Sequence, residues 1–181
     1  MVTLTTKSGR LINLRPPQAG DVNILYHYAR DLGSEDTFIL LNPDLPVTLA
    51  EETDYLASCL KKMAANWQVH YLAFQDDRLI GSCQVTVQGR RKLHVGAFGI
   101  SLLKPYRQDG LGGQLARWVI HEAQTKMHST LITLEVFANN QVALRFYRQL
   151  GFVEYGRLPG GIKYRDQSLD AVLMYLKCDE A

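Results

Sequence analysis

The amino-acid sequence predicts an α/β fold with one mixed, mostly antiparallel central sheet flanked by about four helices. Apolar residues alternate or run together in seven short segments typical of strands, and they recur at helical intervals in four other segments. The two kinds of segment are interleaved, which is typical of a single sheet with helices packed on it. The length of 181 residues is ordinary for one domain, so we expect residues 1–181 to fold as one unit.

The first third of the chain predicts one strand and two helices. Residues 10–15 alternate as a strand and are followed by two prolines. Asp21 is a candidate N-cap for the first helix, which we expect to end near Gly33. Thr48 and Glu51 have the spacing of a capping box, which predicts that a second helix begins there.

The remaining elements follow from the same patterns. Acidic or glycine turns separate three strand-like runs, so we expect an antiparallel meander. The expected elements are strands at 69–74, 79–87 and 93–103, a helix at 112–127, a strand at 131–137, a helix at 140–150, and strands at 152–158 and 169–177 around a bend at 159–161. Gly151 is suited to the left-handed cap that ends the last helix.

Composition and charge exclude several classes of function. With 20 Lys and Arg against 18 Asp and Glu, the net charge of +2 does not favour binding to nucleic acid or to a membrane surface. The chain has no apolar run that could span a bilayer and no secretory signal pattern, so we expect a cytoplasmic protein. Three cysteines without C-x-x-C spacing disfavour a disulfide framework and a zinc site.

The strongest local motif is a glycine-rich loop between a predicted strand and a predicted helix: Arg107, Gln108, Asp109, Gly110, Leu111, Gly112 and Gly113. Backbone N–H groups at a helix N-terminus lack internal partners and bind anions, and glycine lets a phosphate approach them. Three interpretations are a plain tight turn, a nucleotide loop and a coenzyme A pyrophosphate site. No Lys-Ser/Thr pair follows the glycines and no strand-loop-helix unit opens the chain, so a nucleotide loop is disfavoured.

A second motif decides among these interpretations. Leu134-Glu135-Val136 is followed by N-x-x-A-x-x-x-Y-x-x-x-G-F from Asn140 to Phe152. Together with the glycine loop, this arrangement resembles the GNAT N-acetyltransferase family over about residues 69–177. The resemblance implies a GNAT-type sheet, acetyl-CoA as co-substrate, no metal, and transfer of an acetyl group to an amine.

The resemblance also implies which residues bind the coenzyme. Ile100, Ser101 and Leu102 would offer backbone groups to the pantetheine arm, and the loop 107–113 would wrap around the pyrophosphate. A backbone N–H near Leu102 would stabilise the negative charge that develops on the carbonyl oxygen. Asn140 would lie along the coenzyme, although its position is equally that of a helix N-cap.

Glu135 and Tyr147 are the candidate catalytic residues. A protonated amine has no lone pair, so a base is useful, and Glu135 would accept the proton. Tyr147 would protonate the departing thiolate, an arrangement similar to that of ribosomal-protein alanine N-acetyltransferases. Each residue has an alternative role: Glu135 as a solvated strand residue, and Tyr147 as core packing. His94 is a further candidate base, because residues 96–99 contain no acid.

The acceptor is not specified by these motifs. The resemblance implies a small-molecule amine or a protein N-terminus, bound by the first two helices, the connection 33–47 and a loop at Lys163–Asp166. It also allows a homodimer. An acyl-CoA-binding sensor or non-catalytic domain is the alternative function, and a purely structural domain would leave the combined motifs unexplained.

Overall fold

An eight-stranded sheet runs through the computed structural model, which describes residues 2–35, 38 and 45–178. In spatial order its strands are β1 (Val2–Thr5), β2 (Leu11–Arg15), β3 (Gln68–Gln75), β4 (Arg78–Val87), β5 (Val95–Leu102), β6 (Leu131–Phe137), β8 (Gln167–Lys177) and β7 (Val153–Tyr164). The β5–β6 pair is parallel and all other neighbours are antiparallel. The predicted mixed, mostly antiparallel sheet is therefore confirmed.

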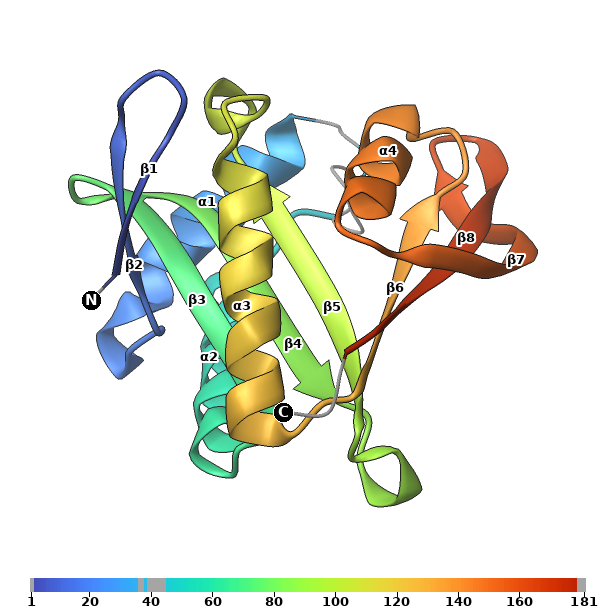
Figure 1. The fold of residues 1–181 in the computed structure, drawn as a ribbon. Helices are drawn as coiled ribbons and strands as arrows, with labels where there is room; N and C mark the ends of the chain where they lie inside the picture. Colours follow the sequence, from blue (N-terminus) through green and yellow to red (C-terminus); the bar gives the residue numbers. More distant parts are fainter. Residues whose placement is uncertain (1, 36–37, 39–44, 179–181) are drawn as a thin grey trace.

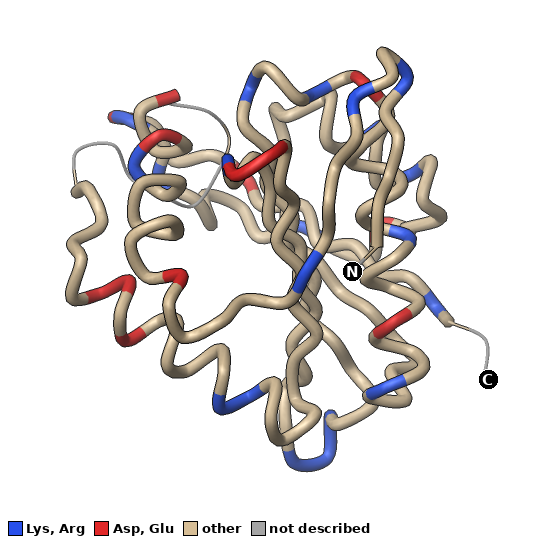
Figure 2. The backbone as a smooth tube through the Cα atoms, turned by 90° about the vertical axis from the view of Figure 1, so that its left-hand side faces the viewer, with Lys and Arg blue, Asp and Glu red and all other residues tan. Residues whose placement is uncertain are grey.

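Four α-helices flank the sheet in the described part of the chain, as the sequence predicts. They are α1 (Val22–Ser34), α2 (Leu49–Ala64), α3 (Leu111–Met127) and α4 (Gln141–Gln149). Helix α3 crosses one face, α1 and α2 lie behind the other, and α4 lies beside the upper end of β6 (Figure 1). Figure 2 shows Lys and Arg positions interspersed with Asp and Glu positions along the chain.

The apolar core is divided between the two faces of the sheet. Tyr71 belongs to the larger cluster, which includes the buried residues of α3, and its hydroxyl donates to Glu122 of that helix at 2.7 Å. The next residue, Leu72, belongs to a second cluster with Leu25 of α1 and Leu56 of α2. This alternation along β3 follows from the period of two in a strand, and it defines an α3 face and an α1/α2 face.

The parallel pair β5–β6 opens into a wedge. The two strands pair only through residues 95–97 and 131–133. Residues 98–102 remain paired with β4, but no strand in the described part of the chain pairs with them on the β6 side. Figure 1 shows β5 and β6 close together at one end and separating towards α4. One edge of β5 therefore keeps unpaired backbone groups, which can bind an extended ligand.

Several local predictions are confirmed. The Thr48–Glu51 capping box forms, with the Thr48 side chain accepting from the Glu51 N–H at 3.2 Å and Glu51 accepting from the Thr48 N–H at 2.8 Å. Gly151 has a φ of 95°, a conformation that favours glycine. The three central strands form the expected meander.

Other local features differ from the expectations. Strand β1 was not expected, and it forms a hairpin with β2. Asp21 is the N-cap residue of α1 as predicted, and the helix ends at Ser34, but the Asp21 carboxylate makes no capping hydrogen bond and binds the Arg15 guanidinium at 2.7 Å. The expected bend at 159–161 lies inside β7, where the register with β8 shifts between Leu158 and Ile162.

A buried histidine makes the stability of the fold dependent on pH. His70 is 1% exposed, its Nε2 lies 2.8 Å from Ser82 Oγ, and its Nδ1 has no hydrogen-bond partner among the described residues. Burial lowers its pKa from 6.5 to about 4. The unfolded chain therefore binds a proton at a higher pH than the folded chain does, and stability decreases as the pH falls from about 6.5 to about 4.

We expect the free energy of unfolding to fall by about 2 kcal/mol between pH 7 and pH 5 because of His70. Urea unfolding of the wild type and of His70→Gln at both pH values measures this effect. The variant should lose most of that pH dependence, whatever its stability at pH 7. An equal dependence in both proteins would contradict the assignment to His70.

Candidate active site

A cavity of about 700 Å³ lies between the first two helices and the sheet. Its lining comes from α1 and α2, from the middle of β4 and β5, from the end of β6, and from α4. Helix α4 belongs to the other side of the wedge, so the cavity continues through the opening between β5 and β6. A group bound on one face of the sheet can therefore meet a group bound on the other.

Glu135 lines this cavity from β6. Its neighbours Leu134 and Val136 are buried in the core on the α3 face. Alternation then places the Glu135 side chain on the α1/α2 face, where the cavity is. The register of β6 therefore places the Glu135 carboxylate beside the wedge.

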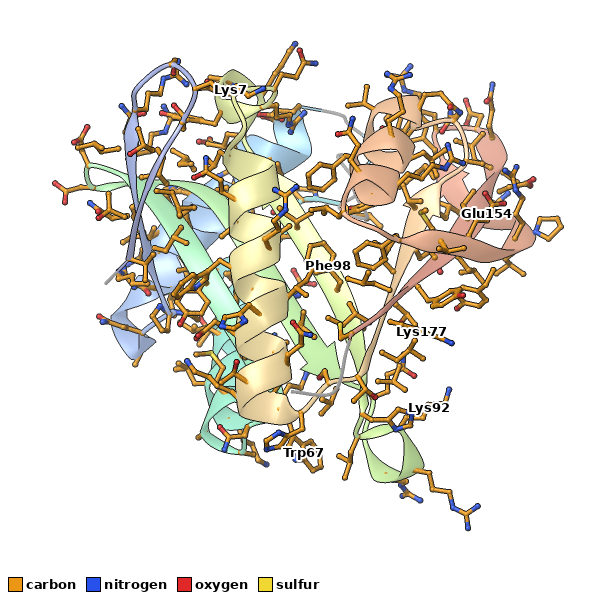
Figure 3. All side chains as sticks on the ribbon, viewed as in Figure 1. Lys7, Trp67, Lys92, Phe98, Glu154 and Lys177 are labelled. Atoms are coloured by element: carbon orange, nitrogen blue, oxygen red, sulfur yellow. The ribbon has the colours of Figure 1, made fainter. Side chains whose placement is uncertain are left out.

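Tyr147 approaches the same cavity from α4. Its ring packs edge-on against Phe98 of β5, with 6.2 Å between ring centroids, and against Phe152 at 5.8 Å. Figure 3 shows Phe98 between β5 and β6, in the opening of the wedge. Burial, with a smaller effect of Cys83, raises the pKa of the Tyr147 hydroxyl, so the group stays protonated at neutral pH. Tyr147 thus both packs in the core and lines the cavity.

The loop before α3 presents a row of unpaired backbone donors. The N–H groups of residues 108–113 donate no hydrogen bond within the described part of the chain. Gln108 and Gly110 have φ values of 61° and 81°, which turn the chain sharply into the helix. A Cβ at Gly112 would lie 3.5 Å from the Leu102 side chain and 3.6 Å from the Phe146 ring, so this position faces the space between β5 and α4.

The side chains of the loop hold it in place. Arg107 donates from Nε to the Leu102 carbonyl at 2.8 Å and forms an ion pair with Glu35. Asp109 accepts from the Ser8 N–H at 2.9 Å and from the Ser8 hydroxyl. Leu111 is fully buried. The side chains of Arg107, Asp109 and Leu111 are therefore engaged within the protein itself.

Two cations that sequence reasoning missed flank the loop. A Cβ at Gly110 would lie 3.2 Å from Lys7 Cγ, and a Cβ at Gly113 would lie 3.2 Å from the Arg117 guanidinium. Figure 3 shows Lys7 beside the loop that precedes α3. Lys7 arrives there because the unexpected β1–β2 hairpin places it against Asp109, whose carbonyl accepts from the Lys7 N–H at 3.0 Å. Alternation in residues 2–5 was the sequence signal for that hairpin.

The other expected coenzyme residues lie along the wedge. Ile100 and Ser101 line the cavity, and the Ser101 hydroxyl lies 2.8 Å from the Tyr28 hydroxyl of α1. Leu102 is partly buried, and its carbonyl accepts a hydrogen bond from the Arg107 guanidinium. Asn140 lines the cavity while its side chain accepts from the Ala143 N–H at 3.0 Å. Asn140 is thus a helix N-cap that also faces the cavity.

Two expectations about the site are corrected. His94 lies in the exposed turn before β5, because the strand begins at Val95 and not at residue 93. It is absent from the described lining of the cavity, so it is no longer a candidate base. Residues 163–166 are also absent from that lining, and β7 contributes Ile162 instead. Of the connection 33–47, the described residues Phe38, Leu45 and Val47 line the cavity, and 36–37 and 39–44 lie outside the described residues.

One acid of the cavity was not expected from the sequence. Glu52 is buried on the inner side of α2 and lines the cavity. Burial raises the pKa of its carboxyl group. The sequence does not single out Glu52, because it directly follows Glu51 of the capping box. An acid in the first turn of a helix is already favoured by the helix dipole.

The described part of the chain shows no metal site and no membrane-spanning helix. No group of three or more His, Cys, Asp or Glu side chains in residues 2–35, 38 and 45–178 is arranged to hold a metal ion. No helix in those same residues is long and apolar enough to cross a membrane.

Known proteins with the same architecture are numerous. The GNAT-family acetyltransferase structure from Streptococcus pneumoniae is 27% identical, with a TM-score of 0.82 over 93% of this chain and 99% of that chain. The ribosomal-protein-S5-alanine acetyltransferase from Vibrio fischeri is 16% identical, with a TM-score of 0.83 over 99% of this chain and 98% of that chain, which shows a shared fold.

Sequence comparison identifies the family. A curated relative from Drosophila melanogaster, the probable N-acetyltransferase san, is 30% identical over 84 residues, and the matched stretch spans 45% of this chain and 45% of that relative. The model of the acetyltransferase (GNAT) family matches residues 34–152, which include the glycine loop, β6 and α4. The chain therefore belongs to the acetyltransferase (GNAT) family.

Proposed function

We propose that this protein is an acetyl-CoA-dependent N-acetyltransferase that acetylates the primary amine of a small molecule or a protein N-terminus. One observation carries the proposal: the wedge between β5 and β6 joins a loop of unpaired N–H groups to a cavity lined by carboxylates. Coenzyme and amine then approach from opposite faces of the sheet. Family membership supports the same reaction.

The residues present fit acetyl-CoA. The unpaired N–H groups of 108–113 suit a pyrophosphate, and Lys7 and Arg117 add positive charge beside them. The free edge of β5 at residues 98–101 suits the amide groups of a pantetheine arm, with Asn140 across the wedge. When bound, acetyl-CoA supplies the activated acetyl group.

Glu135 and Tyr147 divide the proton transfers in this proposal. Glu135 accepts a proton from the ammonium form of the acceptor, directly or through a water molecule, which frees the lone pair for attack. Tyr147, whose hydroxyl is protonated at neutral pH, donates its proton to the departing thiolate, which leaves as the free thiol. Backbone groups of β5 near Leu102 stabilise the negative charge that develops on the carbonyl oxygen.

Glu135→Gln should lower kcat by about 10- to 100-fold at pH 7, because an amide cannot accept the amine proton. The defect should shrink towards pH 9.5, since the free amine then forms without help. Rate-against-pH curves measure this, with Asp77→Asn in the exposed β3–β4 turn as a control that removes one carboxylate elsewhere. A Glu135→Gln curve that overlays the wild-type curve would show that Glu135 is not the base.

The activity itself is tested by thiol release. The purified chain is mixed with acetyl-CoA and a panel of amines, and the acetylated product is confirmed by mass spectrometry. We expect amine-dependent thiol release with at least one member of the panel. Tight binding of acetyl-CoA without acetylation of any amine would support an acyl-CoA sensor instead.

The proposal also covers the domain organisation and the cellular compartment of the enzyme. We propose that residues 1–181 act as one catalytic domain, since the site draws on elements from the β1–β2 hairpin to β7. We also propose that the protein acts in a reducing cytoplasm, where cysteines such as Cys59 and Cys83 stay as free thiols.

A further inference from the structure

Glu52 is a buried carboxylate that has no hydrogen bond or ion pair with another described residue. It projects from the same side of α2 as Leu56 and Cys59 and is only 7% exposed. Burial raises the pKa of its carboxyl group, because the charged form loses solvent there. The positive end of α2 stabilises a charge in the first turn by less than about 1 kcal/mol at an ordinary site. A buried carboxylate in this position favours a positively charged ligand.

Several polar side chains of the cavity wall are bonded within the protein. Tyr28 and Ser101 hydrogen-bond to each other at 2.8 Å. Ser82 is bonded to His70, and Gln84 Oε1 accepts from Gln68 at 2.6 Å and from Tyr55 at 3.2 Å. Asn140 Oδ1 accepts from the Ala143 N–H. The two amide oxygens of the wall are thus engaged, so the carboxylates are the strongest acceptors left for an ammonium group.

The charges that line the cavity have one sign. Its described lining contains the carboxylates of Glu51, Glu52 and Glu135, and no Lys, Arg or His. Residues 36–44 of the sequence contain no Lys, Arg or His either. Glu51 is engaged by Thr48 in the capping box, which leaves Glu52 and Glu135 to bind cations.

Apart from these acids, much of the described lining of the cavity is apolar. The lining includes side chains from α1, from the connection to α2, and from β6 and β7: Leu25, Ala29, Leu32, Val47, Phe137 and Ile162. A methylene chain fits such walls, because its burial is favourable and it has no polar group to satisfy. A peptide backbone fits them poorly, because each residue carries an N–H and a C=O that need partners.

We propose that the acceptor is an aliphatic diamine or polyamine, with one ammonium group held by Glu52 and the reacting amine placed at Glu135. This inference rests on the proposed acetyl transfer and adds the class of acceptor. Glu52 is then a specificity residue: it binds the distant charge of the substrate and takes no part in proton transfer.

The test compares diamines with monoamines of equal length. Wild type and Glu52→Gln are assayed for acetylation of α,ω-diaminoalkanes with three to seven carbons and of the matching n-alkylamines. The wild type should prefer its best diamine over the matching monoamine by about 10- to 100-fold in kcat/KM, the range of a charged hydrogen bond. Glu52→Gln should reduce that preference to about one, mainly through KM. Asp54→Asn, an exposed acid of the same helix, should leave the preference unchanged.

Calorimetric titration separates this inference from the proposed activity. The diamine alone should bind the wild type at least about 10 times more tightly than it binds Glu52→Gln. This result would support the acceptor class even if no acetyl transfer were detected, in which case the proposed activity would be the part that failed. Equal diamine affinity in the two proteins would overturn the role of Glu52. A uniform loss of kcat for all amines with the preference retained would also overturn it, because Glu52 would then act in proton transfer.

Discussion

Replacing Tyr147 by phenylalanine should lower kcat for acetyl transfer by about 10²- to 10⁴-fold, the contribution expected of a general acid. The substitution keeps the ring and its edge-on contacts with Phe98 and Phe152, so packing of α4 is preserved. Only the hydroxyl group, and with it the proton to be donated, is lost. The affinity for acetyl-CoA should change little, and steady-state kinetics with calorimetric titration distinguish the two quantities.

Tyr155→Phe is the matched control for that experiment. Tyr155 lies exposed on β7, outside the described lining of the cavity. The substitution there removes the same hydroxyl group. Its kcat should equal that of the wild type. If Tyr147→Phe also stayed within a few-fold of wild type, Tyr147 would be a packing residue and the thiolate would take its proton from another source.

Gly112→Glu should abolish the stabilisation of the protein by acetyl-CoA. A side chain at this position enters the space between Leu102 and Phe146, and the added carboxylate would repel a pyrophosphate held on the N–H groups of 108–113. We expect the dissociation constant to rise by more than about 100-fold, equivalent to about 3 kcal/mol. Calorimetric titration and the shift in melting temperature both measure this.

Gly112→Ala controls for the loss of glycine. Its Cβ would make only ordinary van der Waals contacts, at 3.5 Å from Leu102 and 3.6 Å from Phe146, and alanine favours the helix that contains it. The alanine variant should therefore fold and retain most of its affinity. A folded Gly112→Glu variant with wild-type affinity would remove the pyrophosphate from this loop.

Local signals explain how much of the fold could be predicted. The Thr48–Glu51 box and the Gly151 cap depend on residues within a few positions of one another, so their chemistry is visible in the sequence. The same holds for the loop at 107–113, whose glycines precede a helical pattern. Hydrophobic alternation predicted the meander for the same reason.

Contacts between distant residues explain the rest. Ser8 binds Asp109 across 101 positions and Glu35 binds Arg107 across 72, and nothing local marks either pair. These contacts engage the side chains of Arg107 and Asp109 but do not use the N–H groups of 108–113. Likewise, Glu52 is a candidate ligand-binding residue only because the buried face of α2 lines the cavity, which the sequence does not show. The position of Glu135 depended on a register that Leu134 and Val136 establish in the packed sheet.

The most direct test of the account is a crystal structure of the chain with coenzyme A. The account predicts pyrophosphate oxygens on the N–H groups of 108–113 and the pantetheine arm hydrogen-bonded to the unpaired edge of β5 at residues 98–101. The thiol should then lie in the wedge, within reach of the Tyr147 hydroxyl. A coenzyme bound elsewhere, with β5 and β6 still separated and the edge of β5 unoccupied, would contradict the claim that donor and acceptor meet through this opening.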